Sequence, residues 1–267
     1  MKDERPENKR TILTLHSPGG NGDSRGLEPV FRPFSDSYRV VFFDLRGCGR
    51  SEEKGLPSFA QLSDDIEELR RKLGLGRVIL AGGSGGGFLA LEYAIRYPEN
   101  LSALLLRGTG PIATNWEHIR KHVRETRQKV DWDRLQRYWT GQCIDDDDLR
   151  QALLEIGPLY SGKRRSNPVM HDARDMTTHW HFRTHNYAMR EQIDWSVKSR
   201  LREIRVPTLI VHGDKDWVVP LSHARMLLEG IPDSQLEVFK GCGHSPQLEE
   251  KSRFEKLVRD FLSAHGL

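Results

Sequence analysis

Short apolar runs alternate with longer amphipathic segments over most of the chain. The short runs are rich in Val, Ile, Leu and Phe and lie between turn-forming residues. Continuous apolar runs of this length are typical of strands that are buried on both faces of a parallel sheet. We therefore expect core strands at residues 11–15, 39–43, 78–81, 103–106, 208–211 and 236–239.

The segments between these runs carry the signals of helices. Apolar residues recur at helical spacing over residues 59–73, where Ser58 and Gln61 have the spacing of a capping box and Gly74 is a stop signal. Residues 254–262 form a similar amphipathic stripe. Strands that alternate with helices in this way favour an α/β fold, in which a mostly parallel sheet has helices on both faces.

The alternation stops between residues 111 and 199, where no strand-like run occurs. Helical patterns over residues 116–130, 132–140 and 145–156 dominate this segment, and no Gly- or Ser-rich linker flanks it. We predict a core of residues 1–110 and 200–267 and a helical cap of residues 111–199, inserted after the fourth core strand. An independent second domain is the alternative interpretation.

Composition and charge exclude several classes of protein. The 267 residues include 41 basic and 38 acidic ones, a net charge of +3, and the two signs are interspersed, unlike the basic patch of a nucleic-acid binder. No apolar run approaches the roughly 18 residues of a membrane span, and the charged N-terminus lacks a secretory signal. The three cysteines form no CxxC pair. We expect a cytoplasmic protein that binds neither nucleic acid nor membrane.

The segment around Ser84 carries the most specific chemical signal. Gly82, Ser84 and Gly86 match the G-x-S-x-G motif, between a predicted strand and a helical pattern. The serine of this motif lies on a sharp, strained turn, and glycines on either side avoid steric collisions. The turn places the hydroxyl at a helix N-terminus, whose free N–H groups suit a developing oxyanion. We predict that Ser84 is a nucleophile.

A phosphate-binding or dinucleotide-binding loop is an alternative interpretation of the same glycines. The G-x-G-x-x-G pattern would need a third glycine where the chain has Phe88, and no Lys-Ser or Lys-Thr pair follows. A purely structural turn is the remaining alternative.

A serine nucleophile needs a base, and the base needs an orienting acid. In folds with this type of turn, the acid and then the histidine follow the serine along the chain. His244 lies in a loop after the last predicted strand, and we predict that it is the base. Asp216 lies beyond the end of the preceding strand and is the predicted acid. Asp214 is the alternative acid, although it could instead cap the loop by accepting backbone N–H groups.

With these residues, the chain resembles the α/β-hydrolase superfamily and, within it, the proline-iminopeptidase-like serine hydrolases. The motifs that carry the resemblance span nearly the whole chain: His16 with residues 18–20, and residues 44–51, 82–86, 206–210, 213–216 and 243–244. The resemblance implies the core sheet, the helical cap and a Ser-His-Asp hydrolase. We expect no cofactor. Dehalogenase and epoxide-hydrolase activities are disfavoured, because those members have an Asp nucleophile where this chain has Ser84.

The loop after the first core strand departs from the family pattern. Relatives read His-Gly-Gly-Pro-Gly there, whereas this chain reads His16-Ser17-Pro18-Gly19-Gly20. Pro18 has no N–H group and cannot stabilise an oxyanion. We therefore predict that the backbone N–H groups of Ser17 and Gly85 form the oxyanion hole.

The N-terminal side of the sheet is the second departure. Only ten residues precede the first predicted strand, whereas relatives usually have an antiparallel hairpin there. We expect a sheet that lacks these strands and begins one edge short. A second copy of the chain would cover the exposed edge, which suggests a homodimer.

The cap determines the substrate, and the sequence says less about it. Peptidase relatives bind an α-amino group with cap carboxylates, often in a Trp-Glu-x-x-Thr stretch that is absent here. Residues 171–187 are rich in His and aromatic side chains, which either line a pocket or pack the cap onto the sheet. We predict substrate contacts from Trp180, His181, Tyr187 and Trp217. The spacing of the histidines in this stretch also allows a metal site, but without an acidic ligand we expect no metal.

These features lead to one leading function and two alternatives. The leading prediction is a serine hydrolase that cleaves a small carboxylic ester or lactone through an acyl-enzyme, with a small-molecule substrate as its binding partner. The first alternative is a proline-iminopeptidase-like aminopeptidase or amidase, and the second is a ligand sensor without turnover on the same fold.

Overall fold

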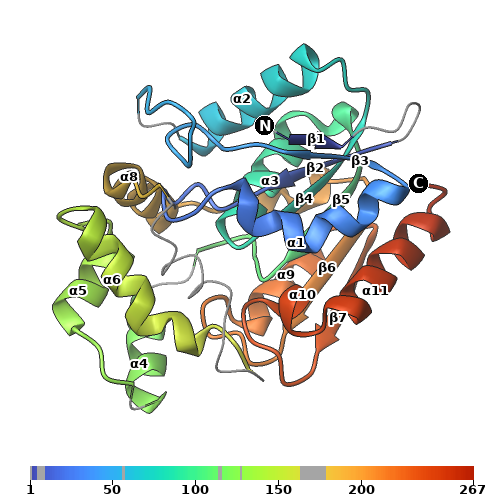
Figure 1. Ribbon diagram of the computed structural model, residues 1–267. Coiled ribbons are helices and arrows are strands. Elements are labelled where there is room, and N and C mark those ends of the chain that lie inside the picture. The colour runs from blue at the N-terminus through green and yellow to red at the C-terminus, as the bar shows by residue number, and fades with distance from the viewer. Residues whose placement is uncertain (1, 5–9, 56–57, 114–115, 127, 163–178) are drawn as a thin grey trace.

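A seven-stranded sheet forms the centre of the protein (Figure 1). The computed structural model describes residues 2–4, 10–55, 58–113, 116–126, 128–162 and 179–267. The strand order is β1-β3-β2-β4-β5-β6-β7, and all neighbours except β1 and β3 are parallel. The strands are β1 (Lys2–Glu4), β2 (Thr11–Leu15), β3 (Arg39–Phe42), β4 (Val78–Gly83), β5 (Leu101–Arg107), β6 (Thr208–Gly213) and β7 (Ser234–Phe239).

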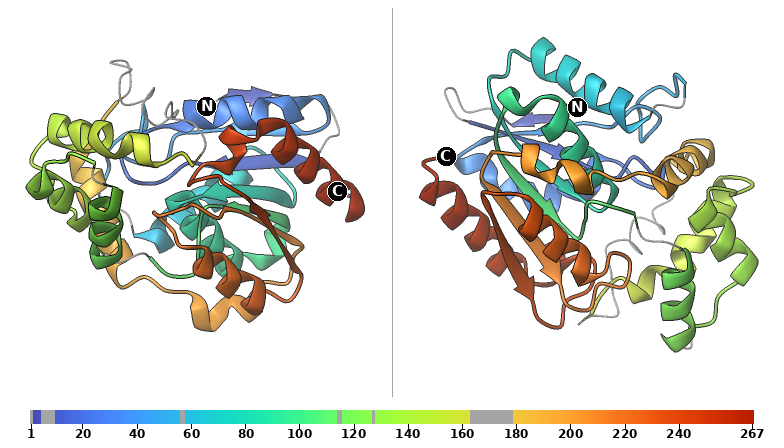
Figure 2. Two further views of the ribbon diagram at one scale, coloured as in Figure 1. Left: turned by 90° about the horizontal axis from the view of Figure 1, so that it is seen from below. Right: turned by 180° about the vertical axis from the view of Figure 1, so that it is seen from behind.

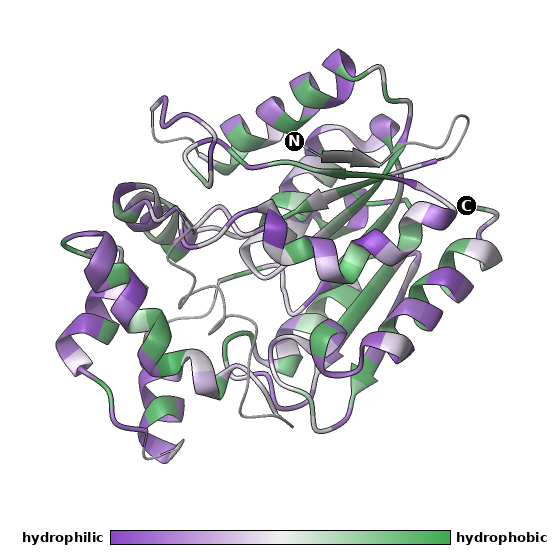
Figure 3. Ribbon diagram, in the orientation of Figure 1, coloured by the Kyte–Doolittle hydropathy of each residue, from purple (hydrophilic) through white to green (hydrophobic). Residues whose placement is uncertain are grey.

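All six predicted core strands are present, and the predicted α/β fold is confirmed. Every residue of β2, β4 and β6 is buried, because helices cover both faces of the sheet. These strands are mainly apolar and lack the alternation of a half-exposed strand, and most of the sheet is green in Figure 3.

Helices form a layer on each face of the sheet (Figure 2). One face packs against α2 (Phe59–Lys72), α3 (Gly85–Arg96) and α9 (Leu221–Gly230), and the other against α1 (Glu28–Phe31) and α11 (Lys251–Ala264). The predicted capping signals of α2 are present: the Ser58 hydroxyl accepts the Gln61 N–H at 3.2 Å, and Gly74 has a φ of +62° just beyond the helix. Short elements complete the core: η1 (Ser24–Leu27), η2 (Arg32–Asp36), η3 (Pro98–Asn100), η5 (Lys198–Glu203) and α10 (Pro246–Glu249).

The N-terminal edge of the sheet differs from the expectation in one respect. The described residues contain no antiparallel hairpin, but the three-residue strand β1 pairs antiparallel with β3. The edge of β3 is therefore paired, and β1 is the edge strand of the sheet. The homodimer stays a prediction.

Helices fill the part of the predicted cap that the structure describes. They are α4 (Trp116–Thr126), α5 (Trp132–Thr140), α6 (Asp146–Ile156), η4 (Gly157–Leu159) and α8 (Phe182–Ile193). The two ends of this segment meet, because Ile112 and Ser196 form an antiparallel bridge and the Val197 N–H donates to Pro111 O at 2.9 Å. Helices α4 to α6 share an apolar cluster with Trp217, Val218 and Val219 of the loop after β6. The helical segment therefore packs on the carboxyl end of that strand. The exact boundaries between core and cap stay a prediction.

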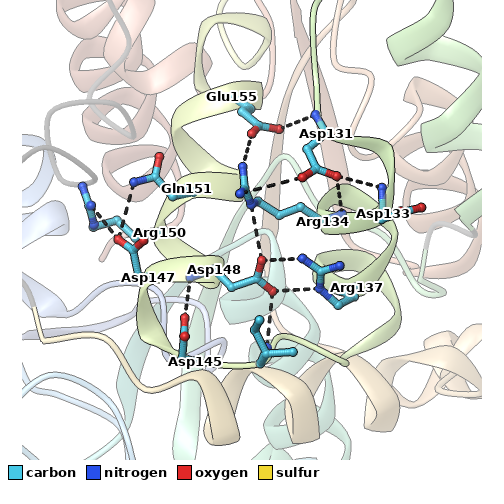
Figure 4. Close-up of polar contacts among 11 residues, drawn as sticks. Asp131, Asp133, Arg134, Arg137, Asp145, Asp147, Asp148, Arg150, Gln151 and Glu155 are labelled. Carbon is cyan, nitrogen blue, oxygen red and sulfur yellow. Dashed lines mark hydrogen bonds and ion pairs between the residues drawn. The ribbon is translucent and has the colours of Figure 1, made fainter.

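An ion-pair network joins α5 to α6 (Figure 4). The Asp148 carboxylate accepts Arg137 Nη2 at 2.6 Å and Arg134 Nε at 3.3 Å, while Arg134 also pairs with Glu155. The Asp145 side chain caps α6 by accepting the Asp148 N–H at 2.8 Å. The hydrogen bond from Arg137 is the largest influence on the pKa of Asp148 and lowers it, so that the buried carboxylate stays ionised.

We predict that Asp148→Asn lowers the free energy of unfolding by about 2 kcal/mol, because hydrogen bonds to charged groups are lost at a buried position. The matched control is Asp147→Asn, whose side chain is 66% exposed and contacts Arg150 and Gln151 at the surface. This control should cost less than about 0.5 kcal/mol. Urea unfolding of both variants measures the difference.

The pH dependence follows from the lowered pKa of Asp148. A depressed carboxyl pKa contributes stability above the unfolded value, near 3.9, which is lost as the pH falls through the folded value. The gap between wild type and Asp148→Asn should therefore close in acid. Equal losses in both variants, or a gap that persists at low pH, would contradict this role of the network.

Candidate active site

Ser84 lies on a strained turn between β4 and α3. Its backbone angles are φ 53° and ψ −127°, and it is the only non-glycine residue with a positive φ among the residues described. Such a conformation costs about 1–3 kcal/mol and persists only where the surrounding structure enforces it. The Ser84 N–H donates to Arg107 O at 3.1 Å, and Thr109 Oγ1 donates to Ser84 O at 2.9 Å. Both ends of the strained residue are therefore tied to the end of β5.

The glycines on either side of Ser84 allow the backbones to come close together. A Cβ atom on Gly82 would collide with Gly86 O, and a Cβ on Gly86 would lie 2.5 Å from Leu15 O. Any side chain at these positions would push α3 away from β4 and β2. The two glycines of the motif are therefore required by the close packing of the backbone at this turn.

A buried carboxylate holds the His244 imidazole. His244 Nδ1 lies 2.8 Å from Asp216 Oδ2, and the other oxygen of Asp216 accepts the N–H groups of Val218 and Val219 at 2.9 and 3.0 Å. Burial alone would raise the pKa of Asp216, but His244, His212 and the Val219 N–H lower it below its usual value. Asp216 is therefore an anion that orients His244.

The alternative acid occupies a different position. Asp214 Oδ1 accepts the Gly241 N–H at 2.6 Å and so connects the loop after β6 to the loop after β7. The structure brings Asp216, rather than Asp214, to His244.

The loop after β2 lies against the first turn of α3. A Cβ on Gly85 would lie only 2.5 Å from Ser17 Oγ and 3.2 Å from Pro18 Cδ. His16 orients this loop: its Nε2 accepts the Leu45 N–H at 3.0 Å, so Nδ1 carries the proton and donates to Ser17 O at 2.7 Å. Burial lowers the pKa of His16, which keeps the ring neutral in this arrangement.

A cavity of about 440 Å³ lies between the sheet and the cap. Ser84 and His244 both line it, together with Ser17 and Gly85. The cap contributes mainly aromatic and aliphatic side chains to its wall: Trp116, Tyr138, Trp139, Leu153, Tyr160 and Met189. A cavity of this size, apolar with a few convergent polar groups, is typical of a small-molecule site.

A family model described as alpha/beta hydrolase fold matches residues 11–251. The chain belongs to the alpha/beta hydrolase fold family. It is 32% identical over 264 residues to proline iminopeptidase PfmaB of Pestalotiopsis fici, covering 96% of this chain and 93% of that protein. It is 31% identical over 271 residues to a 2-hydroxy-6-oxo-6-phenylhexa-2,4-dienoate hydrolase of Comamonas testosteroni, covering 94% and 87%.

Solved structures agree with this assignment. An esterase from Exiguobacterium antarcticum superposes with a TM-score of 0.76 at 25% identity, covering 97% of this chain and 94% of that one. The enol-lactonase from Burkholderia xenovorans has a TM-score of 0.79 at 22% identity, covering 98% and 95%, which shows a common fold. This protein is therefore a proline-iminopeptidase-like α/β hydrolase, and its relatives include peptidases, esterases and hydrolases of dienoates.

The four predicted substrate contacts of this α/β hydrolase do not line the cavity. Trp180 packs against the apolar cluster of the cap, and His181 Nε2 donates to Gly49 O at 3.1 Å. Tyr187 faces a separate, much smaller pocket. Trp217 is buried, and its indole N–H donates to a backbone carbonyl, Leu159 O, at 2.7 Å.

For Tyr187, the difference arises from the register of α8. The helix directs His185, Met189 and Gln192 toward the cavity, whereas Tyr187 lies two residues from His185 and so faces the opposite side. Trp180 and His181 precede the first residue of the helix. Residues 171–178 of the same stretch lie outside the described part of the chain.

His185 of the cap has structural partners. The ring nitrogens of His185 lie 3.0 Å from Gly19 O and 2.9 Å from Tyr138 O, so this residue connects α8 to α5 and to the loop after β2. Burial lowers the pKa of His185 to about 4. Within the described residues, no group of three His, Cys, Asp or Glu side chains is placed to hold a metal ion. None of the described helices has the length and apolar character needed to cross a bilayer.

Sequence reasoning missed a second histidine beside the acid. His212 is fully buried at the end of β6, with Nε2 2.8 Å from Val219 O and 3.4 Å from Asp216 Oδ2. Burial lowers the pKa of His212, and the neutral ring supports the same carboxylate that holds His244. The available signal was a histidine at the end of an otherwise apolar strand.

We predict that Gly82→Ala destabilises this α/β hydrolase by roughly 3 kcal/mol, because the added methyl group collides with backbone rather than with a movable side chain. Gly76→Ala is the control, since its Cβ would meet no atom within 4 Å. Denaturant unfolding should leave the control within about 1 kcal/mol of wild type. Equal stability of Gly82→Ala and wild type would contradict the close approach at this turn.

Proposed function

We propose that this α/β hydrolase cleaves a small carboxylic ester or lactone through an acyl-enzyme, with Ser84 as nucleophile, His244 as base and Asp216 as the orienting acid. The observation that carries the proposal is that Ser84 and His244 line one cavity, with His244 bonded to a buried, ionised Asp216. The substrate is a small molecule, because the cavity is about 440 Å³.

The proposed steps follow from these positions. Because Nδ1 of His244 is bonded to Asp216, Nε2 is free to take the proton of Ser84 as its Oγ attacks the carbonyl carbon. The N–H groups of Gly85 and Ser17 stabilise the oxyanion of the tetrahedral intermediate. The intermediate collapses to an acyl-enzyme, and His244 returns the proton to the leaving alkoxide. Water, deprotonated by His244, then releases the acid and regenerates Ser84.

The charges in the cavity favour an ester or lactone over an amino-terminal substrate. Asp23 is the only carboxylate among the described lining residues, and it is engaged by Arg25 at 2.7 Å. An α-ammonium group would therefore find no available carboxylate there. The 32% identity to a protein named proline iminopeptidase makes aminopeptidase activity the second candidate.

Comparison of two substrates tests the proposal. We expect hydrolysis of p-nitrophenyl butyrate, with kcat reduced by at least ~10⁴-fold in Ser84→Ala. We expect a far lower kcat/KM for prolyl-naphthylamide. A higher kcat/KM for the amide would favour the aminopeptidase, and ester hydrolysis that survives Ser84→Ala would overturn the proposed mechanism.

A pair of aspartate variants tests the role of the acid. Asp216→Asn should lower kcat by about 10⁴-fold with little change in KM, because the imidazole loses its orienting anion. Asp214→Asn keeps an oxygen that can accept the Gly241 N–H and should change kcat by less than about tenfold. Steady-state kinetics with p-nitrophenyl butyrate measures both. A larger loss of kcat in Asp214→Asn than in Asp216→Asn would show that Asp216 is not the acid.

A further inference from the structure

A cationic side chain lies beside the nucleophile and takes no part in the proposed chemistry. Arg107 is the last residue of β5, and its carbonyl accepts the Ser84 N–H. Its side chain crosses Gly83, because a Cβ on that glycine would collide with the guanidinium. The guanidinium then lies 5.7 Å from the centre of the Phe31 ring, on the α1 side of the sheet. Arg107 and Gly83 both line the cavity that contains Ser84.

The guanidinium of Arg107 has no polar partner among the residues that the structure describes. Its Nε atom is fully buried without a hydrogen bond, and no carboxylate pairs with it. The one lining carboxylate, Asp23, is held by Arg25. By contrast, the arginines of the cap network, Arg134 and Arg137, each pair with buried Asp148. An unpaired charge in such a position destabilises the fold, which suggests that an external anion completes it.

The charge on Arg107 persists at neutral pH. Burial lowers the pKa of Arg107 to about 10, which leaves the guanidinium protonated near pH 7. It is also the only Arg or Lys among the described residues that line the cavity. A single guanidinium matches a singly charged, planar carboxylate, with which it forms two parallel hydrogen bonds. A phosphate dianion would leave one charge uncompensated.

We propose that Arg107 binds a carboxylate carried by the substrate, next to the ester or lactone bond that Ser84 attacks. The proposal rests on the proposed hydrolase function and narrows its substrate class to carboxylate-bearing esters or lactones, such as half-esters of short dicarboxylic acids. Leu27 and Leu248 also line the cavity, and apolar side chains of this kind suit an apolar linker between the two groups.

Two matched pairs of esters test the proposal. In the first pair the acyl group carries the carboxylate (mono-p-nitrophenyl glutarate against p-nitrophenyl butyrate), and in the second the leaving group does (p-carboxyphenyl butyrate against phenyl butyrate). The measured quantity is kcat/KM for the charged ester divided by kcat/KM for the neutral ester. For at least one pair, Arg107→Met should lower this ratio by about 10- to 100-fold. Arg107→Lys should retain part of the selectivity, because it keeps the charge without the planar fork.

The control removes an arginine that lies outside the cavity. Arg200 lies on the surface and pairs with Glu203, so Arg200→Met should leave both ratios unchanged. If both ratios in Arg107→Met stay within about twofold of the wild-type values, the proposal is overturned. In that case, Arg107→Met should still hydrolyse the neutral esters, and the double variant with Ser84→Ala should not. This result would show that the proposed hydrolase function holds although the proposed carboxylate site does not.

A binding measurement keeps the proposal testable without turnover. In the Ser84→Ala background, calorimetric titration with monomethyl glutarate should show a Kd about tenfold or more higher once Arg107 is replaced by Met. The melting temperature of Arg107→Met should be no lower than that of wild type, because the removed charge has no polar partner among the described residues, and Met keeps an apolar contact with the Phe31 ring. Equal Kd values for both proteins would overturn the proposal, even if no ester were hydrolysed.

Discussion

The positive φ of Ser84 is the constraint on which the site depends. The strand β4 and the helix α3 approach so closely at Gly82 and Gly86 that the chain must turn sharply between them. Hydrogen bonds to Arg107 and Thr109 at the end of β5 hold that turn. The same packing therefore places Ser84 at the cavity and starts α3 beside the loop after β2. It also brings the Arg107 guanidinium against Gly83, next to the proposed nucleophile.

The proposed base depends on both the core and the cap. The Asp216 carboxylate fixes the His244 ring from the core. The backbone N–H of His244 donates to Tyr160 O at 2.8 Å, just after η4 of the cap. The Trp217 indole donates to Leu159 O from the loop that carries the acid. A shift of the cap would therefore move the loop that carries His244.

The sequence was sufficient to predict which residues lie at the ends of the parallel strands. It was not sufficient to predict which side chains of a cap helix face the cavity. Parallel strands bring their carboxyl ends to one edge, so Ser84 and the loops after β6 and β7 could be placed together from motif and order. The register of α8 is a tertiary property, which is why Tyr187 was predicted in place of His185. Arg107 was visible as a charge ending an apolar run, but its lack of a polar partner depends on contacts far apart in the chain. The strand β1 was missed because three residues are too short to show a pattern.

The most direct test of the central claim is to label the protein with an activated fluorophosphonate and to locate the adduct by mass spectrometry of its peptides. The proposed mechanism predicts one stoichiometric adduct on Ser84, formed in parallel with the loss of ester hydrolysis and much more slowly when His244 is replaced by Ala. An adduct on another residue, or complete loss of activity with Ser84 unmodified, would contradict it.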